Sequence, residues 1–299
     1  MNTAASAPAP APAPATTPAP TPPASASGFG LLRTLRLGAL RIGYEVRAYF
    51  RQGDTVFFTF LFPLLMLTIF AVAFSEGDFG STPDGHALTA ADYYLPAMLA
   101  AGVLLSGLQN LATDIATEKS DGTLKRLAGL PLSPVSYFIG KIGQVLVTAL
   151  LQAALLVALA RIAFDVQLPD DPAAWLTFAW VFLFGVTTCA LLGIGLSGLP
   201  RSGKSATAVI IPIVLVLQFI SGVYIQFSML PDWLQTVANV FPLAWLAHGM
   251  RAVFLPEGYA TLEAGGEWNL AGVAIVCGIW LIVGLIITRA TFRWIRKDG

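Results

Sequence analysis

The sequence predicts an all-α polytopic membrane protein, and three observations carry that prediction. Of the 299 residues, 56% are hydrophobic and 11% are charged, whereas about 25% of the residues of a soluble domain are charged. The mean hydropathy of +0.72 is too high for a water-soluble chain of this size. Long stretches without Asp, Glu, Lys or Arg recur at the length of about 20 residues that a helix needs to cross a bilayer.

Charge and cysteine content exclude several classes of protein. Seventeen basic and 17 acidic residues give a net charge of zero, without the basic excess that a nucleic-acid partner requires. Two cysteines and two histidines are too few for a disulfide framework or a metal cluster. No nucleophile and base stand at a recognisable spacing. We therefore expect no nucleic-acid partner, no catalytic residue, and no cofactor or metal in this chain.

Two segments precede the first apolar stretch. Residues 1–27 are dominated by Ala, Pro, Ser and Thr and carry no charge, a composition typical of a disordered tail. Residues 28–54 place five arginines on one side of a helix and Leu31, Leu35, Ile42, Val46 and Tyr49 opposite them. This pattern predicts an amphipathic helix in the membrane interface, with the arginines towards anionic lipid headgroups. The five arginines are Arg33, Arg36, Arg41, Arg47 and Arg51.

Residues 55–299 are predicted to form the six-span domain. A seventh apolar run over 233–250 is doubtful, and the positive-inside rule decides against it. Six spans with both termini in the cytoplasm place 15 of the 17 basic residues on the cytoplasmic side, and a seventh span would leave 12 there. We therefore expect an outer-side re-entrant helix pair over 231–251. The predicted spans are 55–75, 93–113, 142–160, 173–200, 205–230 and 268–288.

The predicted spans hold no carboxylate, Lys or Arg, which weighs against an ion-coupled carrier. They or their ends do hold polar side chains, which serve either as interhelical hydrogen-bonding groups or as contacts for a substrate. The sequence leaves both roles open. These residues are Gln109, Asn110, Gln144, Gln152, Gln218 and Gln226.

Two sequence patterns typical of nucleotide-binding loops occur in this chain, but the predicted secondary structure around them does not fit such a loop. Residues 193–198 match G-x-G-x-x-G, and residues 198–205 match G-x-x-x-x-G-K-S. Both motifs require a strand, a tight turn and then a helix. Here the pattern stands between two stretches of membrane-span length. We therefore expect no intrinsic nucleotide site.

Two segments carry a resemblance to a known family. The predicted inner loop contains Glu118, Lys119, Gly122, Thr123, Leu127, Pro131, Leu132 and Ser133. Within it, Gly122 and Thr123 indicate the start of a short amphipathic helix, and Pro131 ends it. The predicted outer segment contains Ser221, Gly222, Pro231, Trp233, Pro242, Trp245 and Arg251. In order and spacing, both resemble the type-two ABC exporter permease family over about residues 30–297. Ser120 departs from the family pattern, which often has a second Glu there.

The resemblance implies the permease subunit of an ATP-driven ABC exporter in a bacterial inner membrane. A separate ATP-binding subunit would carry ATP and Mg and dock on the inner loop (Glu118, Lys119, Gly122, Thr123, Leu127 and Pro131) and on the helix over 28–51. A second permease copy, giving a homodimer, would complete the pathway for a drug, an antibiotic or a lipid-like molecule. Pro231, Trp233, Pro242, Trp245 and Arg251 would form an outer gate, or an interfacial aromatic belt. The alternatives are a polysaccharide or lipid-linked glycan exporter, a stand-alone channel or ion-coupled carrier, and a membrane enzyme of lipid metabolism.

Overall fold

The computed structural model describes residues 30–81, 87–200, 202–263 and 266–291. Within these ranges every regular element is a helix, and the strand-like pairing is limited to one antiparallel bridge between Ser81 and Ala87. The all-α prediction is confirmed for this part of the chain. The predicted tail over 1–27 lies outside the described residues.

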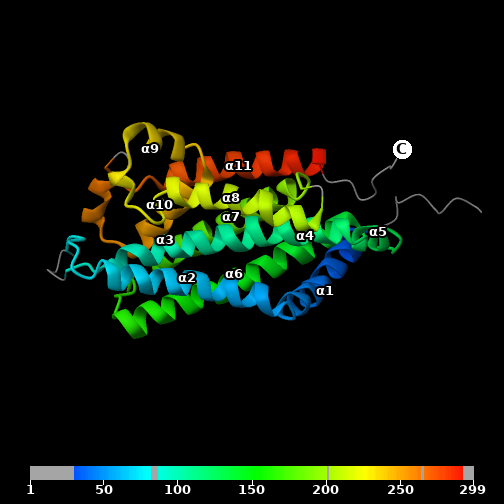
Figure 1. The fold of residues 1–299 in the computed structure, drawn as a ribbon, viewed down its shortest axis with the longest axis horizontal. Helices are drawn as coiled ribbons and strands as arrows, with labels where there is room; N and C mark the ends of the chain where they lie inside the picture. Colours follow the sequence, from blue (N-terminus) through cyan, green and yellow to red (C-terminus); the bar gives the residue numbers. More distant parts are fainter. Residues whose placement is uncertain (1–29, 82–86, 201, 264–265, 292–299) are drawn as a thin grey trace, which may run out of the picture.

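Six helices in the described ranges are long and apolar enough to cross a membrane, as predicted. They run side by side along the long axis of the molecule (Figure 1). The chain is thus a multi-pass membrane protein. The six are α2 (Gly53–Ala73), the continuous helix α3–η1–α4 (Ala90–Ser120), α6 (Pro134–Phe164), α7 (Pro172–Leu196), α8 (Gly203–Ile220) and α11 (Leu270–Thr291).

Three of these helices begin or end at least seven residues away from the predicted position. The second continues to Ser120 instead of 113, and the third begins at Pro134 instead of 142. The sequence places the helix limits at flanking charges, but Lys141 pairs with Asp114 and Glu118 in the structure, so the helices continue through these charged residues. The fifth helix stops at Ile220 instead of 230, because Gly222 adopts a left-handed conformation (φ 73°) that turns the chain.

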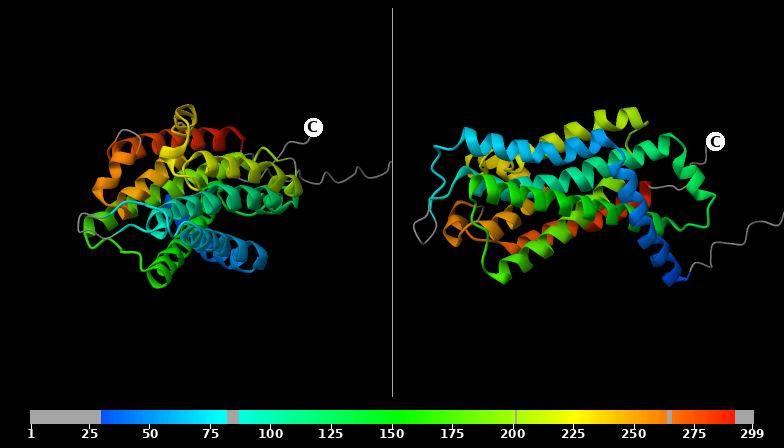
Figure 2. Two further views of the ribbon diagram at one scale, coloured as in Figure 1. Left: turned by 60° about the vertical axis from the view of Figure 1, so that its left-hand side comes forward. Right: turned by 90° about the horizontal axis from the view of Figure 1, so that it is seen from below.

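Helix α1 (Leu31–Phe50) lies at a steep angle to the six long helices and packs along the first half of α6 (Figure 2). The contact is close because Gly140 and Gly143 of α6 leave room for the side chains of Arg41 and Ile42. Arg41 therefore lies on the side of α1 that faces α6, which corrects its predicted place among the headgroup-facing arginines. The other four, Arg33, Arg36, Arg47 and Arg51, are exposed.

The second membrane helix forms the centre of the molecule and is almost entirely buried. It consists of α3 (Ala90–Leu104), the π-helical segment η1 (Leu105–Asn110) and α4 (Leu111–Ser120). A capping box between Thr89 and Asp92 fixes its beginning. Glu118, which the sequence placed on a loop, lies on the last turns of this helix, as does Lys119. Their position on a loop was therefore a wrong prediction.

A short helix follows at the same end of the molecule. Gly122 has φ 80° and lets the chain turn sharply, and the Asp121 carboxylate accepts a hydrogen bond from the backbone N–H of Thr123. Helix α5 (Thr123–Ala128) then buries Leu124 against the bundle. The predicted helix start at Gly122 and Thr123, and the stop before Pro131, are both confirmed.

The opposite end of the molecule is closed by short helices (Figure 1). They are η2 (Phe227–Met229), α9 (Asp232–Ala238), α10 (Pro242–Phe254) and η3 (Glu257–Leu262). Helix α10 packs between α3, α7 and α11, and its 13 residues are too few to cross a bilayer. The helix pair expected over 231–251 is present, with Pro242 opening its second member. Its re-entrant position in a membrane stays a prediction.

Candidate functional site

Four charged side chains meet beside the junction of α1, α4 and α6. The Lys141 ammonium lies 2.8 Å from a carboxylate oxygen of Glu45, 2.6 Å from one of Asp114 and 2.7 Å from one of Glu118. Lys141 is 1% exposed, and such a buried charge requires close partners. We call Glu45, Asp114, Glu118 and Lys141 the Lys141 cluster.

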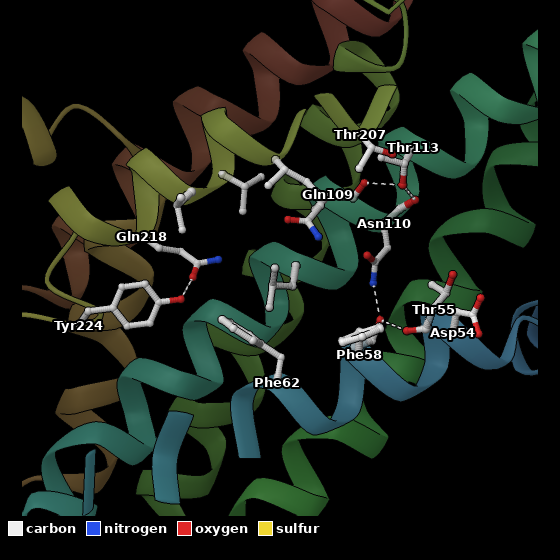
Figure 3. A pocket seen from close by; sticks show the side chains of 15 residues that line it. Asp54, Thr55, Phe58, Phe62, Gln109, Asn110, Thr113, Thr207, Gln218 and Tyr224 are labelled. Atoms are coloured by element: carbon white, nitrogen blue, oxygen red, sulfur yellow. Dashed lines mark hydrogen bonds between the residues drawn. The ribbon is translucent and has the colours of Figure 1, made fainter. Parts of the chain in front are cut away.

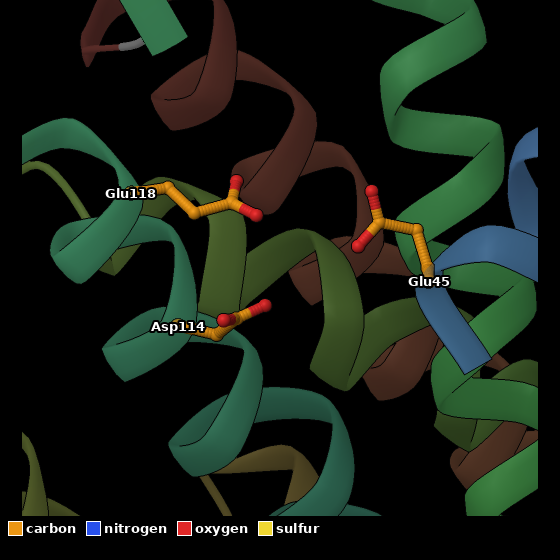
Figure 4. Close-up of side chains that lie close together, drawn as sticks. All are labelled: Glu45, Asp114 and Glu118. Atoms are coloured by element: carbon orange, nitrogen blue, oxygen red, sulfur yellow. The ribbon is translucent and has the colours of Figure 1, made fainter. Parts of the chain in front are cut away.

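Two further groups complete this cluster. Arg41 pairs with the second oxygen of Glu45 at 2.7 Å, and the Tyr137 hydroxyl donates to Glu118 at 2.6 Å. The three carboxylates converge closely enough to hold a metal ion (Figure 4). The Lys141 ammonium, however, contacts all three of them and supplies the compensating charge. The cluster is therefore an ion-pair network that ties α1 to α4 and α6.

The other residues predicted for the docking loop lie around α5. Lys119 and Thr123 are half-buried, and Pro131 is exposed. Leu127 packs against the core, and Gly122 supplies the turn described above. The structure therefore separates Glu118, whose carboxylate points into the Lys141 cluster, from the surface formed by α5 and the residues that follow it.

A cavity of about 510 Å³ lies between α2, the central helix and α8 (Figure 3). Side chains from α2 and α8 give it apolar walls: Phe58, Phe62, Ile211, Val214 and Leu215. Polar side chains form a stripe along it: Thr55, Thr59, Gln109, Asn110, Thr113, Thr207 and Gln218. Asp54, in the first turn of α2, is the one charged residue of the lining.

The π-helical segment η1 brings two adjacent amides to this cavity. Both Gln109 and Asn110 line it, although neighbouring residues of a regular α-helix point about 100° apart. Asn110 donates to the Thr59 hydroxyl at 2.8 Å, whereas the Gln109 side chain has no hydrogen-bonding partner among the described residues. Single π turns are frequent at functional sites. Here the turn offers a free amide to a ligand.

A third amide stands at the far end of the same cavity. The Tyr224 hydroxyl donates to the carbonyl oxygen of Gln218, which leaves the Gln218 nitrogen directed into the cavity (Figure 3). Burial raises the pKa of Tyr224 to about 12, so its hydroxyl keeps the proton that it donates. The cavity therefore combines apolar walls with amide donors and acceptors at two levels.

The end closed by the short helices contains a second buried ion pair. Arg251 of α10 is 1% exposed and binds Glu263 through two nitrogens, at 2.5 and 2.9 Å. The Asn269 backbone N–H donates to Nε2 of His248, so Nδ1 carries the proton and donates to Glu263 at 2.8 Å. Burial opposes ionisation of Glu263, but the Arg251 charge and these hydrogen bonds outweigh it and lower the pKa of Glu263 to about 2.

The residues predicted as an outer gate fall into two groups. Trp233 is 67% exposed, and Pro231 precedes it at the start of α9. Trp245 instead packs over Gly272 and donates its indole N–H to the Asn239 carbonyl at 2.8 Å. Arg251 is held inside by Glu263. A gate at the surface of this end would therefore have Trp233 as its aromatic group.

The phosphate-loop pattern proves to be the start of a helix. Ser202 and Ser205 form the capping box of α8, and the Gly203 N–H donates to the Ser120 hydroxyl at 3.1 Å. The preceding element is the long helix α7, where a nucleotide-binding loop would follow a strand. Residues 202–205 thus attach α8 to the end of α4.

The chain matches a known protein family over most of its length. The family described as "ABC-2 family transporter protein" matches residues 78–290 of this chain. That match covers the central helix, the cavity wall from α8, the short helices and α11. The chain belongs to the ABC-2 transporter family.

Curated relatives of this ABC-2 permease are distant. It is 22% identical over 188 residues to a protein of Escherichia coli (strain K12) named as a probable multidrug ABC transporter permease, YbhR. That alignment covers 62% of this chain and 50% of the relative, so the chain spans about half the length of the YbhR protein. It is also 26% identical over 251 residues, 83% of both chains, to a protein of Cyanophora paradoxa named as a transport permease, ycf38.

Sequence reasoning missed the partners of the two buried cations in this permease. Asp114 stands 27 residues from Lys141, and Glu263 stands 12 from Arg251, so no local spacing pairs them. A signal existed for Lys141, because it adjoins a long apolar stretch and a lysine there needs an acidic partner. Gln109 and Asn110 were recognised, but the turn that directs both into one cavity was not.

Proposed function

We propose that this permease is the membrane subunit of an ATP-driven exporter that moves an amphipathic molecule out of the cytoplasm. The single observation that carries the proposal is the cavity between α2, the central helix and α8. It joins apolar walls to unengaged amides, which is the lining that ligand sites for amphipathic molecules use. Membership of the ABC-2 family supports the transport role.

The lining favours one class of substrate. Phe58, Phe62 and Leu215 suit an apolar body, and the Gln109 and Gln218 amides suit the carbonyl or hydroxyl groups of the same molecule. Drugs, antibiotics and lipid-like molecules have this character. A glycan would need polar groups along its whole length, so the aliphatic wall formed by Ile211, Val214 and Leu215 disfavours the alternative of a polysaccharide exporter.

A separate ATP-binding subunit would supply the energy and would hold ATP and Mg. The surface that suits it is formed by α5, with its exposed Lys125 and Arg126, and by the residues up to Pro131. Glu118 of the Lys141 cluster lies on α4, which directly precedes α5, and the cluster ties α4 to α1. A partner with different affinities for two arrangements of this end would shift the permease between two access states.

A second copy of the permease would complete the pathway. Helices α2 and α8 expose most of their surface in the single chain, including apolar side chains beside the cavity such as Phe58 and Leu215. Two chains that meet along this face would enclose the cavity between them. We place the α5 end and both termini in the cytoplasm of a bacterium, with the six helices in the inner membrane, on the distribution of basic residues.

The proposal is tested by transport in vesicles that contain the permease and its ATP-binding partner. We expect ATP-dependent accumulation of an amphipathic fluorescent dye in inside-out vesicles. Gln109→Leu removes the free amide from the cavity and should lower the initial rate about 10-fold, since one good hydrogen bond to a ligand contributes about 1.4 kcal/mol. The same substitution at the exposed Gln167, far from the cavity, serves as the control and should leave the rate unchanged.

Two outcomes would contradict the proposal. Dye uptake driven by an ion gradient without ATP or a partner would indicate a carrier. An equal rate in the Gln109→Leu and Gln167→Leu variants would remove the cavity from the transport path.

A further inference from the structure

An apolar groove runs between α2 and α6, and it is separate from the cavity described above. Two hollows make up the groove, of about 420 and 470 Å³, and they share Leu61, Leu64 and Leu155. The two hollows therefore form one continuous groove along the two helices. The cavity and the groove lie on different faces of α2, since Phe58 and Phe62 line the first, and Phe57 and Leu61 the second.

The lining of the groove accepts hydrocarbon alone. Its walls are formed by Leu, Ile, Val, Ala and Phe side chains with the single exception of Thr68. The Thr68 hydroxyl donates to the Leu64 carbonyl of its own helix at 2.9 Å, so it is already engaged. A polar ligand would find no partner inside the groove.

The length of the groove fits one acyl chain. It extends along α2 from Val56 to Thr68, and at 1.5 Å per residue these 12 steps measure roughly 18 Å. One leaflet of a bilayer has a hydrocarbon thickness of roughly 15 Å. An acyl chain that entered from the leaflet at the α1 end would therefore fill most of the groove.

Two arginines stand at that entrance. Phe50, the last residue of α1, lines the groove and stacks on Phe60 with ring centroids 6.1 Å apart. Arg47 and Arg51 lie on the same side of α1 as Phe50, within an arc of about 100°. Both arginines are exposed, and in the described part of the chain neither forms an ion pair with an acidic side chain. The entrance to the apolar groove therefore carries positive charge.

We propose that this groove binds an anionic phospholipid of the cytoplasmic leaflet, with one acyl chain between α2 and α6 and the headgroup at Arg47 and Arg51. The positive charge of the two arginines favours an anionic headgroup, and the apolar groove favours a lipid acyl chain. The site goes beyond the transport function and does not depend on it. It rests on the placement of α1 at the cytoplasmic face.

The test is native mass spectrometry of the full-length chain, purified in neutral detergent and titrated with phosphatidylglycerol or with phosphatidylcholine of the same acyl chains. We expect one phosphatidylglycerol to bind more tightly than phosphatidylcholine. Replacing both arginines by glutamine should weaken phosphatidylglycerol binding roughly 30-fold, since each basic residue near an anionic lipid contributes about 1 kcal/mol. Binding of phosphatidylcholine should stay the same.

Two variants separate the groove from the rest of the lipid-facing surface. Ala158 lines the groove, so Ala158→Trp should fill it and abolish tight binding of either lipid. Ala274→Trp makes the same change on the exposed side of α11 and should have no effect. The Arg36→Gln variant, at the other end of α1, is the control for charge.

Equal affinities of the intact protein for the two lipids would overturn the proposal. So would unchanged phosphatidylglycerol binding after the double arginine substitution or after Ala158→Trp. If Ala158→Trp converts a dimer into a monomer and leaves lipid binding intact, the groove is a contact between two copies and the lipid assignment is wrong.

Discussion

At the scale of single residues, two buried cations determine how the ends of the molecule are held together. Lys141 binds carboxylates from α1 and α4, and Arg251 binds Glu263 beyond the end of α10. An unpaired charge in such places would cost several kcal/mol, so each cation requires its partner. Both also lie among the residues that sequence patterns alone assigned to loops or surfaces.

We expect Lys141→Met to destabilise the protein by about 3–5 kcal/mol, because it leaves the buried Glu45 and the half-buried Asp114 and Glu118 without their shared cation. The measurement is the midpoint of denaturant unfolding in detergent micelles, followed by tryptophan fluorescence. Arg161→Gln is the control: this side chain pairs with Asp165 at an exposed position, where an ion pair contributes less than about 1 kcal/mol. Similar losses in the two variants would contradict a structural role for the Lys141 cluster.

The Arg251–Glu263 pair should make stability depend on pH. The pKa of Glu263 is lowered from 4.5 to about 2, so the folded protein favours the ionised form. The resulting stabilisation is complete above the ordinary pKa and is lost as the pH falls towards 2. The melting temperature of Glu263→Gln should therefore lie well below that of the unmodified protein at pH 7, and the gap should narrow below pH 4.5.

Thermal unfolding at a series of pH values measures this gap. The exposed Glu257 provides the control, since Glu257→Gln should leave the melting temperature unchanged at each pH. If the melting temperature of Glu263→Gln stays below that of the unmodified protein by the same amount from pH 7 to pH 3, the stabilising role of ionised Glu263 is wrong.

At the scale of elements, the central helix owes its shape to a close contact with α7. A Cβ added to Gly193 of α7 would lie 2.3 Å from the carbonyl oxygen of Gly107, and one added to Gly107 would lie 2.7 Å from the Cβ of Cys189. Two glycines thus let the backbones meet at the π-helical segment η1. On the side away from α7, the same segment presents Gln109 and Asn110 to the cavity.

Gly193→Ala should therefore destabilise the protein by about 1–3 kcal/mol, because the new methyl group has to displace backbone atoms of η1. It should also reduce transport, since the amides of η1 would move with the backbone. Gly278→Ala is a matched control in α11, where the nearest atom would be an aromatic carbon of Phe184 at an ordinary 3.6 Å. The test is the melting temperature of both variants in detergent. Equal melting temperatures would contradict a close contact between Gly193 and the η1 backbone.

At the scale of the whole molecule, three surfaces of the bundle are distinct. The face of α2 and α8 carries the cavity, the opposite side of α2 carries the apolar groove, and the end at α5 carries the exposed cations Lys125 and Arg126. We propose a different companion for each surface: a second permease copy, a lipid and an ATP-binding subunit. The prediction that belongs to this scale is the drop of about 10-fold in the rate of ATP-driven dye transport in Gln109→Leu.

The sequence by itself determined the membrane class, the number of long helices and the start of α5. These features follow from local properties: apolar length, charge at the flanks, and glycine or proline at a turn. It also identified Gln109, Asn110 and Gln218 as polar groups of the spans, because a polar side chain in an apolar stretch is visible without a structure.

The tertiary structure alone decided where the charges and amides point. Charge was taken to mark the ends of helices, yet Glu118 and Lys141 lie on helices, since carboxylates 23 to 96 residues away from Lys141 neutralise it. Arg41 faces α6 for a similar reason, as Glu45 and a glycine surface are available there. Pairings between distant segments leave no periodic trace in a sequence, and they are what form the cluster, the cavity and the groove.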